Sequence, residues 1–281
     1  MEDAAHTMNN GGHAEEAGVF RCPLCAQALQ NDGKRLFCAR GHSFDLSREG
    51  YVNLLPGRGG AHGDDRGMIE ARRRFLEGGH YLPLRLTLCR RAAESAPRAL
   101  LDAGCGEGWY TEGLANALPE TEICAVDVSK DAVRYTAKRL GKRARCAVAS
   151  VTALPLGDSS VDAVVSVFAP LAAEEFRRVL RSGGVLILAV PGAKHLWQLK
   201  EMLYAEPYEN QPAEKDLPGF EFVKEDELHY LRALDRGALS DLFAMTPYFY
   251  RTPPEGIRRL GECEGADVEM AFRVLVYRKK D

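Results

Sequence analysis

Three cysteines and one histidine near the N-terminus have the spacing of zinc ligands. Cys22 and Cys25 are separated by two residues, Cys38 and His42 by three, and twelve residues lie between the two pairs. Thiolates and an imidazole so arranged can form a tetrahedral Cys3His site, and two such spacings together seldom arise by chance. The alternative is a redox Cys-x2-Cys pair with an incidental third cysteine and histidine. With four protein ligands the zinc ion would have no open position, so we expect it to be structural.

The residues around these ligands predict a zinc ribbon over residues 20–56. Two short strands are expected at 28–30 and 35–37, joined by an Asn-Asp-Gly turn. So short a module has too little core to fold without its metal. Residues 1–19 are rich in Gly, Asn, Glu and His, and we expect a disordered acidic tail there.

A glycine-rich loop further along the chain has the composition of a cofactor site. The sequence DAGCGEG follows a short apolar strand, so Asp102, Gly104 and Gly106 would stand at the carboxyl edge of a sheet beside a helix N-terminus. A dinucleotide-binding loop reads GxGxxG, whereas here the third glycine comes one residue early and an acid precedes the first. The DxGxGxG pattern resembles motif I of Class I S-adenosylmethionine methyltransferases, whose loop packs against the amino-acid end of the cofactor. We therefore favour this cofactor over NAD.

Three further positions would complete the cofactor site. Asp127 ends the next predicted strand, twenty-one residues after Gly106, where a carboxylate can accept both ribose hydroxyls. Ser150 and Val151 follow the third predicted strand, where contacts to the adenine edge are usually made. The glycine loop, the acid and the strand order together favour a methyltransferase over an NAD-binding domain.

Alternating strands and helices from Ala99 onward predict the fold that positions these residues. They indicate a doubly wound α/β domain over residues 99–281 with a mostly parallel, Rossmann-like sheet. Strands are expected at 99–103, 122–126, 144–149, 161–168 and 185–190, and helices at 110–118, 130–140, 172–180 and 194–203. Segments 221–234 and 267–278 are expected to be two closing strands around a helix at 236–244.

Charge is distributed unevenly along the chain. The net charge of −3 does not suggest a nucleic-acid binder, but residues 18–98 carry fourteen Lys/Arg against eight Asp/Glu. Residues 99–281 carry twenty-three against twenty-eight. A basic segment beside an acidic catalytic domain suits a polyanionic partner, although chance asymmetry explains the numbers equally well.

Residues 57–98 are expected to be a linker with a helical segment. The loop GRGGAHGDD is rich in glycine and is predicted to be flexible. A helix at 68–76 carries Arg72, Arg73 and Arg74. These arginines are either a solvated helix face, which is the usual case, or a grip on phosphate.

From about Arg21 to its C-terminus the chain resembles the bacterial 23S rRNA guanine-N1 methyltransferase family, which includes relatives that confer macrolide resistance. The matching stretches are CPLC, the later C-x3-H, FD-x-S-x-EGYVNLLP, ARR-x-FL-x-x-GHY-x-PL, D-x-GCGEG-x-YT, DVSK, FAP and PG-x-x-HL. The resemblance implies a zinc ribbon that helps to recognise an rRNA hairpin, a C-terminal methyltransferase domain and a homodimer.

The resemblance also implies roles for individual residues. By position, the family's zinc ligands match Cys22, Cys25, Cys38 and His42. Its cofactor contacts match Tyr81, Gly106, Glu107 and His195. Without the resemblance, Tyr81 would be read as a core aromatic and His195 as a helix-capping residue.

The expected activity is methylation of guanine N1 in a hairpin loop of 23S rRNA with S-adenosylmethionine as donor. A base inside a hairpin must leave its stack to reach the cofactor, and Phe168, at the end of a predicted strand, is either its stacking partner or a core residue. Two alternatives stay open. One is a small-molecule methyltransferase whose ribbon serves only assembly, and the other is a non-catalytic RNA-binding protein that uses the cofactor as a ligand.

The chain is expected to act in the cytoplasm without a membrane partner. No apolar run reaches the roughly 18 residues that a membrane span needs. The first residues have neither the basic start nor the apolar stretch of a secretory signal.

Overall fold

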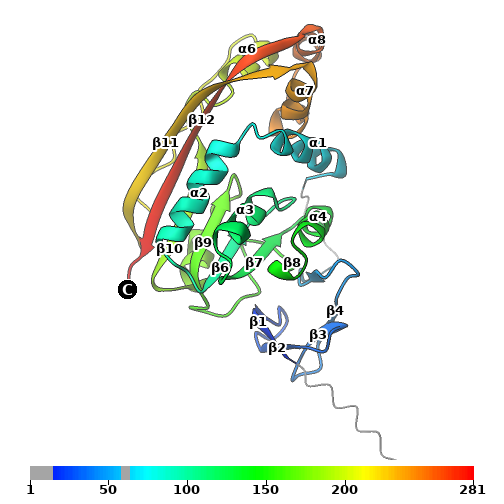
Figure 1. The fold of residues 1–281 in the computed structure, drawn as a ribbon, viewed down its shortest axis with the longest axis vertical. Helices are drawn as coiled ribbons and strands as arrows, with labels where there is room; N and C mark the ends of the chain where they lie inside the picture. The colour runs from blue at the N-terminus through cyan, green and yellow to red at the C-terminus, as the bar shows by residue number, and fades with distance from the viewer. Residues whose placement is uncertain (1–14, 58–63) are drawn as a thin grey trace, which may run out of the picture.

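Two β-sheets organise the chain in a computed structural model that describes residues 15–57 and 64–281 (Figure 1). A four-stranded sheet forms the N-terminal ribbon, and an eight-stranded sheet carries the rest of the fold. The disorder expected for residues 1–14 and the flexibility expected for the loop at 58–63 concern residues outside this description.

The ribbon is an antiparallel sheet in the order β1-β2-β3-β4. Its strands are β1 (Glu15–Arg21), β2 (Ala28–Asn31), β3 (Arg35–Cys38) and β4 (Ser43–Asp45). The two predicted strands lie within β2 and β3. The turn between them forms as expected, because Asn31 and Asp32 accept backbone N–H groups of the turn and Gly33 takes a left-handed conformation with φ of 84°.

The disordered tail was predicted too long. Residues 15–19 lie in β1, which pairs with β2 and buries Ala17 and Phe20. The acidic composition of residues 1–19 gave no indication of a strand, because β1 is anchored by only two buried apolar residues. The ribbon's sheet ends at Asp45, and Val52–Asn53 (β5) pairs with the large sheet instead.

The large sheet has the order β11-β12-β10-β9-β6-β7-β8-β5. Its remaining strands are β6 (Ala99–Ala103), β7 (Glu122–Asp127), β8 (Arg145–Val148), β9 (Val161–Val167), β10 (Leu180–Pro191), β11 (Phe220–Asp235) and β12 (Gly265–Lys279). Only β12 runs antiparallel to both of its neighbours. The predicted doubly wound, Rossmann-like sheet is therefore confirmed.

Helices cover this sheet and its carboxyl edge. They are α1 (Arg66–Glu77), α2 (Leu82–Glu94), α3 (Trp109–Ala117), α4 (Lys130–Leu140), α5 (Ala173–Val179), α6 (Trp197–Leu203), α7 (Arg236–Ala244) and α8 (Pro254–Glu262), with the 3-10 turns η1 (Gly141–Arg143) and η2 (Pro247–Tyr250). The predicted helix at 194–203 begins only at Trp197, because Leu196 takes a left-handed conformation with φ of 60°. The sequence analysis did not predict helix α8.

Helices α1 and α2 belong to the catalytic fold. Phe75 of α1 and Leu84 and Leu88 of α2 are fully buried in one apolar cluster with Leu100 of β6 and Leu114 of α3. In Figure 1, α1 lies between α4 and α7, above the end of the central strands. The basic segment of residues 18–98 is thus divided between the ribbon and the catalytic fold.

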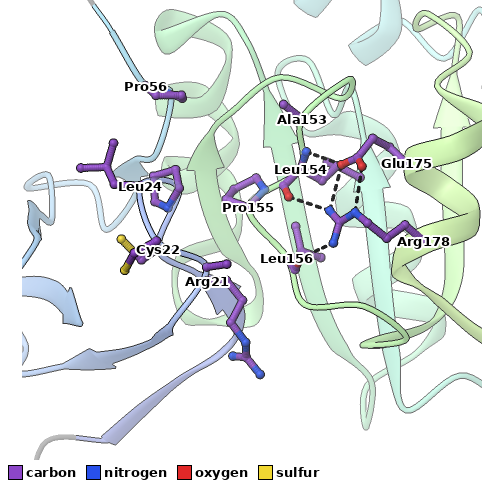
Figure 2. A pocket seen from close by; sticks show the side chains of 13 residues that line it. Arg21, Cys22, Leu24, Pro56, Ala153, Leu154, Pro155, Leu156, Glu175 and Arg178 are labelled. Atoms are coloured by element: carbon purple, nitrogen blue, oxygen red, sulfur yellow. Dashed lines mark hydrogen bonds and ion pairs between the residues drawn. The ribbon is translucent and has the colours of Figure 1, made fainter. Parts of the chain in front are cut away.

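The ribbon docks on the catalytic fold through apolar residues. Phe20 and Leu29 share a buried cluster with Leu154 and Leu156, and the Arg21 N–H donates to the Pro155 carbonyl at 2.8 Å. A groove of about 400 Å³ lies at this junction. Figure 2 shows the residues that line it, with Arg178 turned toward the loop of residues 154–156. The guanidinium of Arg178 donates to the Leu154 and Leu156 carbonyls at 2.9 and 2.8 Å. Within the described residues, no helix is long and apolar enough to cross a membrane.

Candidate zinc site and cofactor cleft

The four predicted zinc ligands converge. Their ligand atoms all lie within 4.8 Å of one another. The Cys25 and Cys38 sulfurs are 3.6 Å apart, and His42 Nδ1 is 3.4 Å from the sulfurs of Cys22 and Cys38. Tetrahedral zinc with Zn–S bonds of about 2.3 Å separates two sulfurs by roughly 3.8 Å, so the group fits the ion.

Two tight turns set this geometry. In the first, the Ala26 N–H donates to the Cys22 carbonyl at 2.8 Å, and in the second, the Gly41 N–H donates to the Cys38 carbonyl at 2.9 Å. Gly41 has φ of 84°, a left-handed conformation that is unfavourable for residues with a side chain. The two loops present their sulfurs and imidazole to a common point.

The glycine loop lies between β6 and α3, as predicted. Gly104 and Gly106 have φ of 83° and 56°, and the Gly104 N–H donates to the Val126 carbonyl at 2.9 Å. A Cβ on Gly104 would collide with Ala169, so the turn after β9 approaches the loop closely. Among the described residues, a Cβ on Gly106 would meet only Arg72 Nη1, at 3.9 Å. The loop therefore fits a ligand at Gly106.

Asp127 and the glycine loop are joined directly. One Asp127 oxygen accepts the Gly106 N–H at 3.0 Å, and the other accepts the Ser129 N–H at 2.8 Å. Burial raises the pKa of Asp127, and these two N–H groups oppose the rise. Each oxygen keeps a lone pair for a ribose hydroxyl, so the carboxylate can hold both the loop and the cofactor. Ser150 and Val151 follow β8 at the same edge of the sheet and are half-buried.

The two other acids of the predicted site are turned inward. Asp102 is 1% exposed and accepts the Thr111 hydroxyl at 2.6 Å. Glu107 is 2% exposed and pairs with Arg139 at 2.9 Å. Neither carboxylate is open to solvent, so both serve the internal hydrogen bonding around the loop.

Tyr81 and His195 form a buried pair. Tyr81 begins α2, His195 lies between β10 and α6, and the Tyr81 Oη to His195 Nε2 distance is 3.3 Å. Burial lowers the pKa of His195 to about 3, so the ring is neutral. Its Nδ1 accepts the Ala271 N–H at 3.3 Å, which puts the ring proton on Nε2 and makes Nε2 the donor to Tyr81.

Phe168 is not a core residue. Its side chain is 44% exposed, and its ring stacks on His195 with an interplanar angle of 17°. Its φ of 54° is rare for a bulky residue and turns the ring out of β9 toward Tyr81. The aromatic surface formed by Phe168, Tyr81 and His195, here called the aromatic platform, adjoins the glycine loop through Ala169.

The three consecutive arginines are bound within the chain. Arg73 pairs with Glu77 one turn along α1, at 2.9 Å. Arg74 pairs with Asp241 of α7 at 2.6 Å. Arg72 pairs with Asp64 and donates to the Met245 carbonyl at 3.2 Å. The three side chains have three different partners, so a joint contact with phosphate would require these ion pairs to break, and that interpretation stays a prediction.

Comparisons with known proteins place the chain among rRNA-modifying enzymes. The zinc-ribbon family model described as "RlmA, N-terminal" matches residues 20–59, and the "Methyltransferase domain" model matches residues 100–184. The 23S rRNA (guanine(748)-N(1))-methyltransferase of Streptomyces fradiae is 37% identical over 88% of this chain and 91% of its own length. Relatives from Micromonospora griseorubida and Bacillus subtilis (strain 168), which carry the 23S rRNA (guanine-N(1)-)-methyltransferase name, are 36% and 34% identical. They cover 95% and 92% of this chain and 99% and 96% of their own lengths.

The chain belongs to the 23S rRNA (guanine-N1)-methyltransferase family. The predicted family and enzyme class are confirmed, and neither a small-molecule methyltransferase nor a non-catalytic binding protein is favoured. The cofactors of this methyltransferase are S-adenosylmethionine and zinc, as its methyltransferase domain and its ribbon with a Cys3His group require.

Sequence reasoning missed the surroundings of two residues near the glycine loop of this methyltransferase. It left Arg72 open between a solvated helix face and a phosphate contact, yet Arg72 Nη1 lies 3.9 Å from the position of a Cβ built on Gly106. Tyr110, directly after the glycine loop, was not singled out, yet its hydroxyl oxygen is buried without a partner among the described residues. The position of Tyr110, two residues beyond the last glycine of the loop, was the available signal.

Proposed function

We propose that this chain methylates N1 of a guanine in a hairpin loop of 23S rRNA. The observation that carries the proposal, beyond family membership, is the aromatic platform beside the glycine loop. An exposed phenyl ring held at the mouth of a cofactor cleft suits a base that has left its stack, because stacking on an aromatic side chain replaces the lost base neighbours. A small apolar substrate would be served better by a closed pocket than by a ring that is 44% exposed.

The residues of the cleft hold the reactants in place. S-Adenosylmethionine supplies, when bound, an electrophilic methyl group for in-line displacement. Phe168 orients the base by stacking, and Tyr81 and His195 support its ring from the buried side. His195 does not take the N1 proton, because Nδ1 already accepts from Ala271 and Nε2 already carries a hydrogen. We therefore assign His195 a positioning role.

The ribbon is proposed to contact the RNA backbone. Lys34, Arg40 and Arg48 are exposed on the ribbon and its following loop, and no ion pair joins them to another described residue. Unpaired exposed cations can neutralise phosphates without first breaking an internal bond. They differ in this respect from the arginines of α1.

Family resemblance further supports a homodimer acting in the cytoplasm. Strand β11 forms one edge of the large sheet and exposes Leu231 and Val223, to 62% and 43%. An edge strand with exposed apolar side chains can be covered by a second copy. Light scattering that gives the mass of one chain at micromolar concentration would exclude the dimer.

Methyl transfer to defined RNA tests the proposed function. Zinc-loaded protein with labelled S-adenosylmethionine should methylate a 23S rRNA hairpin at guanine N1, as located by mass mapping, and free guanosine far less efficiently. Phe168→Ala should lower kcat/KM for the hairpin roughly 5- to 100-fold through lost stacking, and Phe168→Tyr should restore it. Leu171→Ala, which removes another exposed apolar side chain three residues away, is the matched control. Equal activity on free guanosine and on the hairpin would refute the RNA substrate.

A further inference from the structure

A lysine on α6 is fully buried without a carboxylate partner. Lys200 is 0% exposed, and among the described residues no acid forms an ion pair with its ammonium group. Its Nζ donates to the Tyr208 carbonyl and to Asn210 Oδ1, each at 2.8 Å. It also lies over the rings of Tyr208 and Tyr248, 4.6 and 5.8 Å from their centroids. Burying a charge without a counter-ion is costly, so the role of Lys200 has to lie in the groups that it holds.

Asn210 connects Lys200 to the loop that follows β10. Its Nδ2 donates to the Gly192 carbonyl and its backbone N–H to the Ala193 carbonyl, both at 2.8 Å. An ammonium group can only donate, so Lys200 selects the oxygen of the Asn210 amide and leaves the nitrogen for Gly192. Lys200 thereby fixes the orientation of the amide and fastens the segment after α6 to the loop after β10.

The Gly192 carbonyl also bonds to the aromatic platform. It accepts the His195 N–H at 3.1 Å, and the Gly192 N–H donates to the Ala271 carbonyl at 2.8 Å. The Ala271 N–H in turn donates to His195 Nδ1 at 3.3 Å. A closed ring of hydrogen bonds therefore joins Gly192, His195 and Ala271, and Asn210 binds to this ring at the Gly192 carbonyl.

Close packing couples a displacement of Gly192 to the platform. A Cβ on Gly192 would lie 3.2 Å from the Ala271 Cβ, so the loop lies directly against β12. His195 is 6% exposed, and the Phe168 ring stacks on its imidazole with 6.3 Å between centroids. A shift of the Gly192 carbonyl therefore moves the His195 ring, and the Phe168 ring loses the surface on which it rests.

We propose that Lys200 is a positioning residue for the methyl transfer, which acts through Asn210 and Gly192 on His195 and so on the ring that stacks on the target base. This inference rests on the proposed function and adds a buried residue of α6 to those that orient the base. Lys200 itself takes no part in the chemistry, because its Nζ is bonded to Tyr208 and Asn210.

Removal of the ammonium group tests this role. Lys200→Met keeps an unbranched side chain but leaves Asn210 Oδ1 without its donor. The kcat with a 23S rRNA hairpin should fall roughly 5- to 50-fold, because a displaced base reacts slowly. The Kd for the hairpin should stay within about twofold of the parent, since phosphate contacts supply most of that affinity. The Kd for S-adenosylhomocysteine should not change.

Two further comparisons separate positioning from loss of stability. Asn210→Ala breaks the same link at a half-buried position, so it should give a similar loss, and the double variant should lose no more than either single one. In the Phe168→Ala background, Lys200→Met should change kcat by less than about twofold, because the ring that it positions is absent. General destabilisation would lower kcat in both backgrounds.

Arg259→Met is the matched control. Arg259 is also a cation that donates to a backbone carbonyl, that of Met202 on α6, at 2.8 Å, and among the described residues it has no bond to Asn210 or Gly192. It should leave kcat unchanged. Hydrogen exchange gives a readout without RNA: the His195 amide should exchange faster in Lys200→Met and at the parent rate in Arg259→Met. An unchanged rate in Lys200→Met would refute the link to His195.

Other outcomes would also overturn the positioning role. It fails if the kcat of Lys200→Met stays within about twofold of the parent, or if the loss is the same with and without the Phe168 ring. It fails as well if Arg259→Met lowers kcat equally, since the loss would then follow from weaker packing of α6. If the parent methylates free guanosine as well as the hairpin, the proposed substrate is wrong, and the same comparison of variants with guanosine decides the role of Lys200.

Discussion

The acidic side chains around the glycine loop bond to other groups of the protein itself. Asp127 fixes the glycine loop by accepting the Gly106 N–H, and Asp102 and Glu107 bond to Thr111 and Arg139 behind it. The direction of a side chain depends on such partners, and the partner of Glu107 is 32 residues away. The sequence could therefore predict which residues form the loop, but not that two of its acids would be buried. Cofactor contacts by individual residues of this loop stay predictions.

Asp102 should make stability depend on pH. Burial raises its pKa from 3.8 to about 7, opposed by the Thr111 hydroxyl. Because the folded pKa lies above the unfolded one, the stabilisation is fully present below about pH 4 and is lost as pH rises through about 7. Asp102→Asn removes this titration, so the melting temperature of the variant relative to the parent should increase from pH 4 to pH 8, by on the order of 5 °C.

Asp162 provides a control of opposite sign. Burial would raise its pKa, but the Arg181 guanidinium and the Ala99 N–H outweigh burial and lower it. Asp162→Asn should therefore reduce the melting temperature at pH 8 more than at pH 4. If the difference in melting temperature between Asp102→Asn and the parent stays constant from pH 4 to pH 8, Asp102 is ionised in the folded protein.

At the scale of elements, hydrophobic periodicity predicted most of the catalytic fold. It described residues 57–98 as a linker with a helical segment, whereas α1 and α2 pack into the catalytic core. The central strands are nearly all buried, and their continuous apolar runs mark them clearly. Helices α1 and α2 lie before the first central strand in sequence, yet they complete the cleft from above. Their placement depends on contacts with α3 and α7, such as Arg74 with Asp241, which are 167 residues apart. Local sequence patterns do not contain such pairings.

Zinc removal should affect the ribbon and spare the cofactor cleft. The ribbon joins the catalytic fold through the apolar cluster of Phe20 and Leu29 with Leu154 and Leu156, none of which belongs to the glycine loop. Purified protein should contain about one zinc ion per chain. Cys38→Ala should lose the ion and the ribbon's protection in hydrogen exchange, and its affinity for S-adenosylhomocysteine should stay within about threefold of the parent.

Cys263→Ala is the control for the loss of a thiol, because Cys263 lies at the end of α8, outside the ribbon. It should keep the full zinc content. A zinc-free parent protein that retains its ribbon in hydrogen exchange would contradict a structural role for the metal. Loss of cofactor affinity in Cys38→Ala would instead indicate that ribbon and cleft fold as one unit.

At the scale of the whole molecule, the unpaired positive charge of residues 18–98 is confined to a smaller region than the sequence suggested. The excess of positive charge in residues 18–98 includes Arg85, Arg90 and Arg91 of α2, and these pair with Glu112 and Asp226 of the catalytic fold. Cations that are neutralised inside the fold contribute little to an external field. The exposed cations of the ribbon remain, and they lie on the part of the molecule that projects from the catalytic fold in Figure 1.

Salt dependence can decide whether the ribbon grips RNA. Each phosphate contact that is lost should reduce the slope of log affinity against log salt by about one unit. Changing Lys34, Arg40 and Arg48 together to Ala should therefore reduce the slope for a 23S rRNA hairpin by about three and weaken binding most at low salt. The affinity for S-adenosylhomocysteine should not change, because the cleft contains none of these residues. Arg278→Ala with Lys280→Ala removes two exposed cations at the C-terminal end of β12 and directly after it, outside the ribbon, and should leave the slope unaltered. Were the ribbon variant to keep the parent slope while this control lowers it, the RNA would lie along β11 and β12, and the ribbon would serve only to complete the fold.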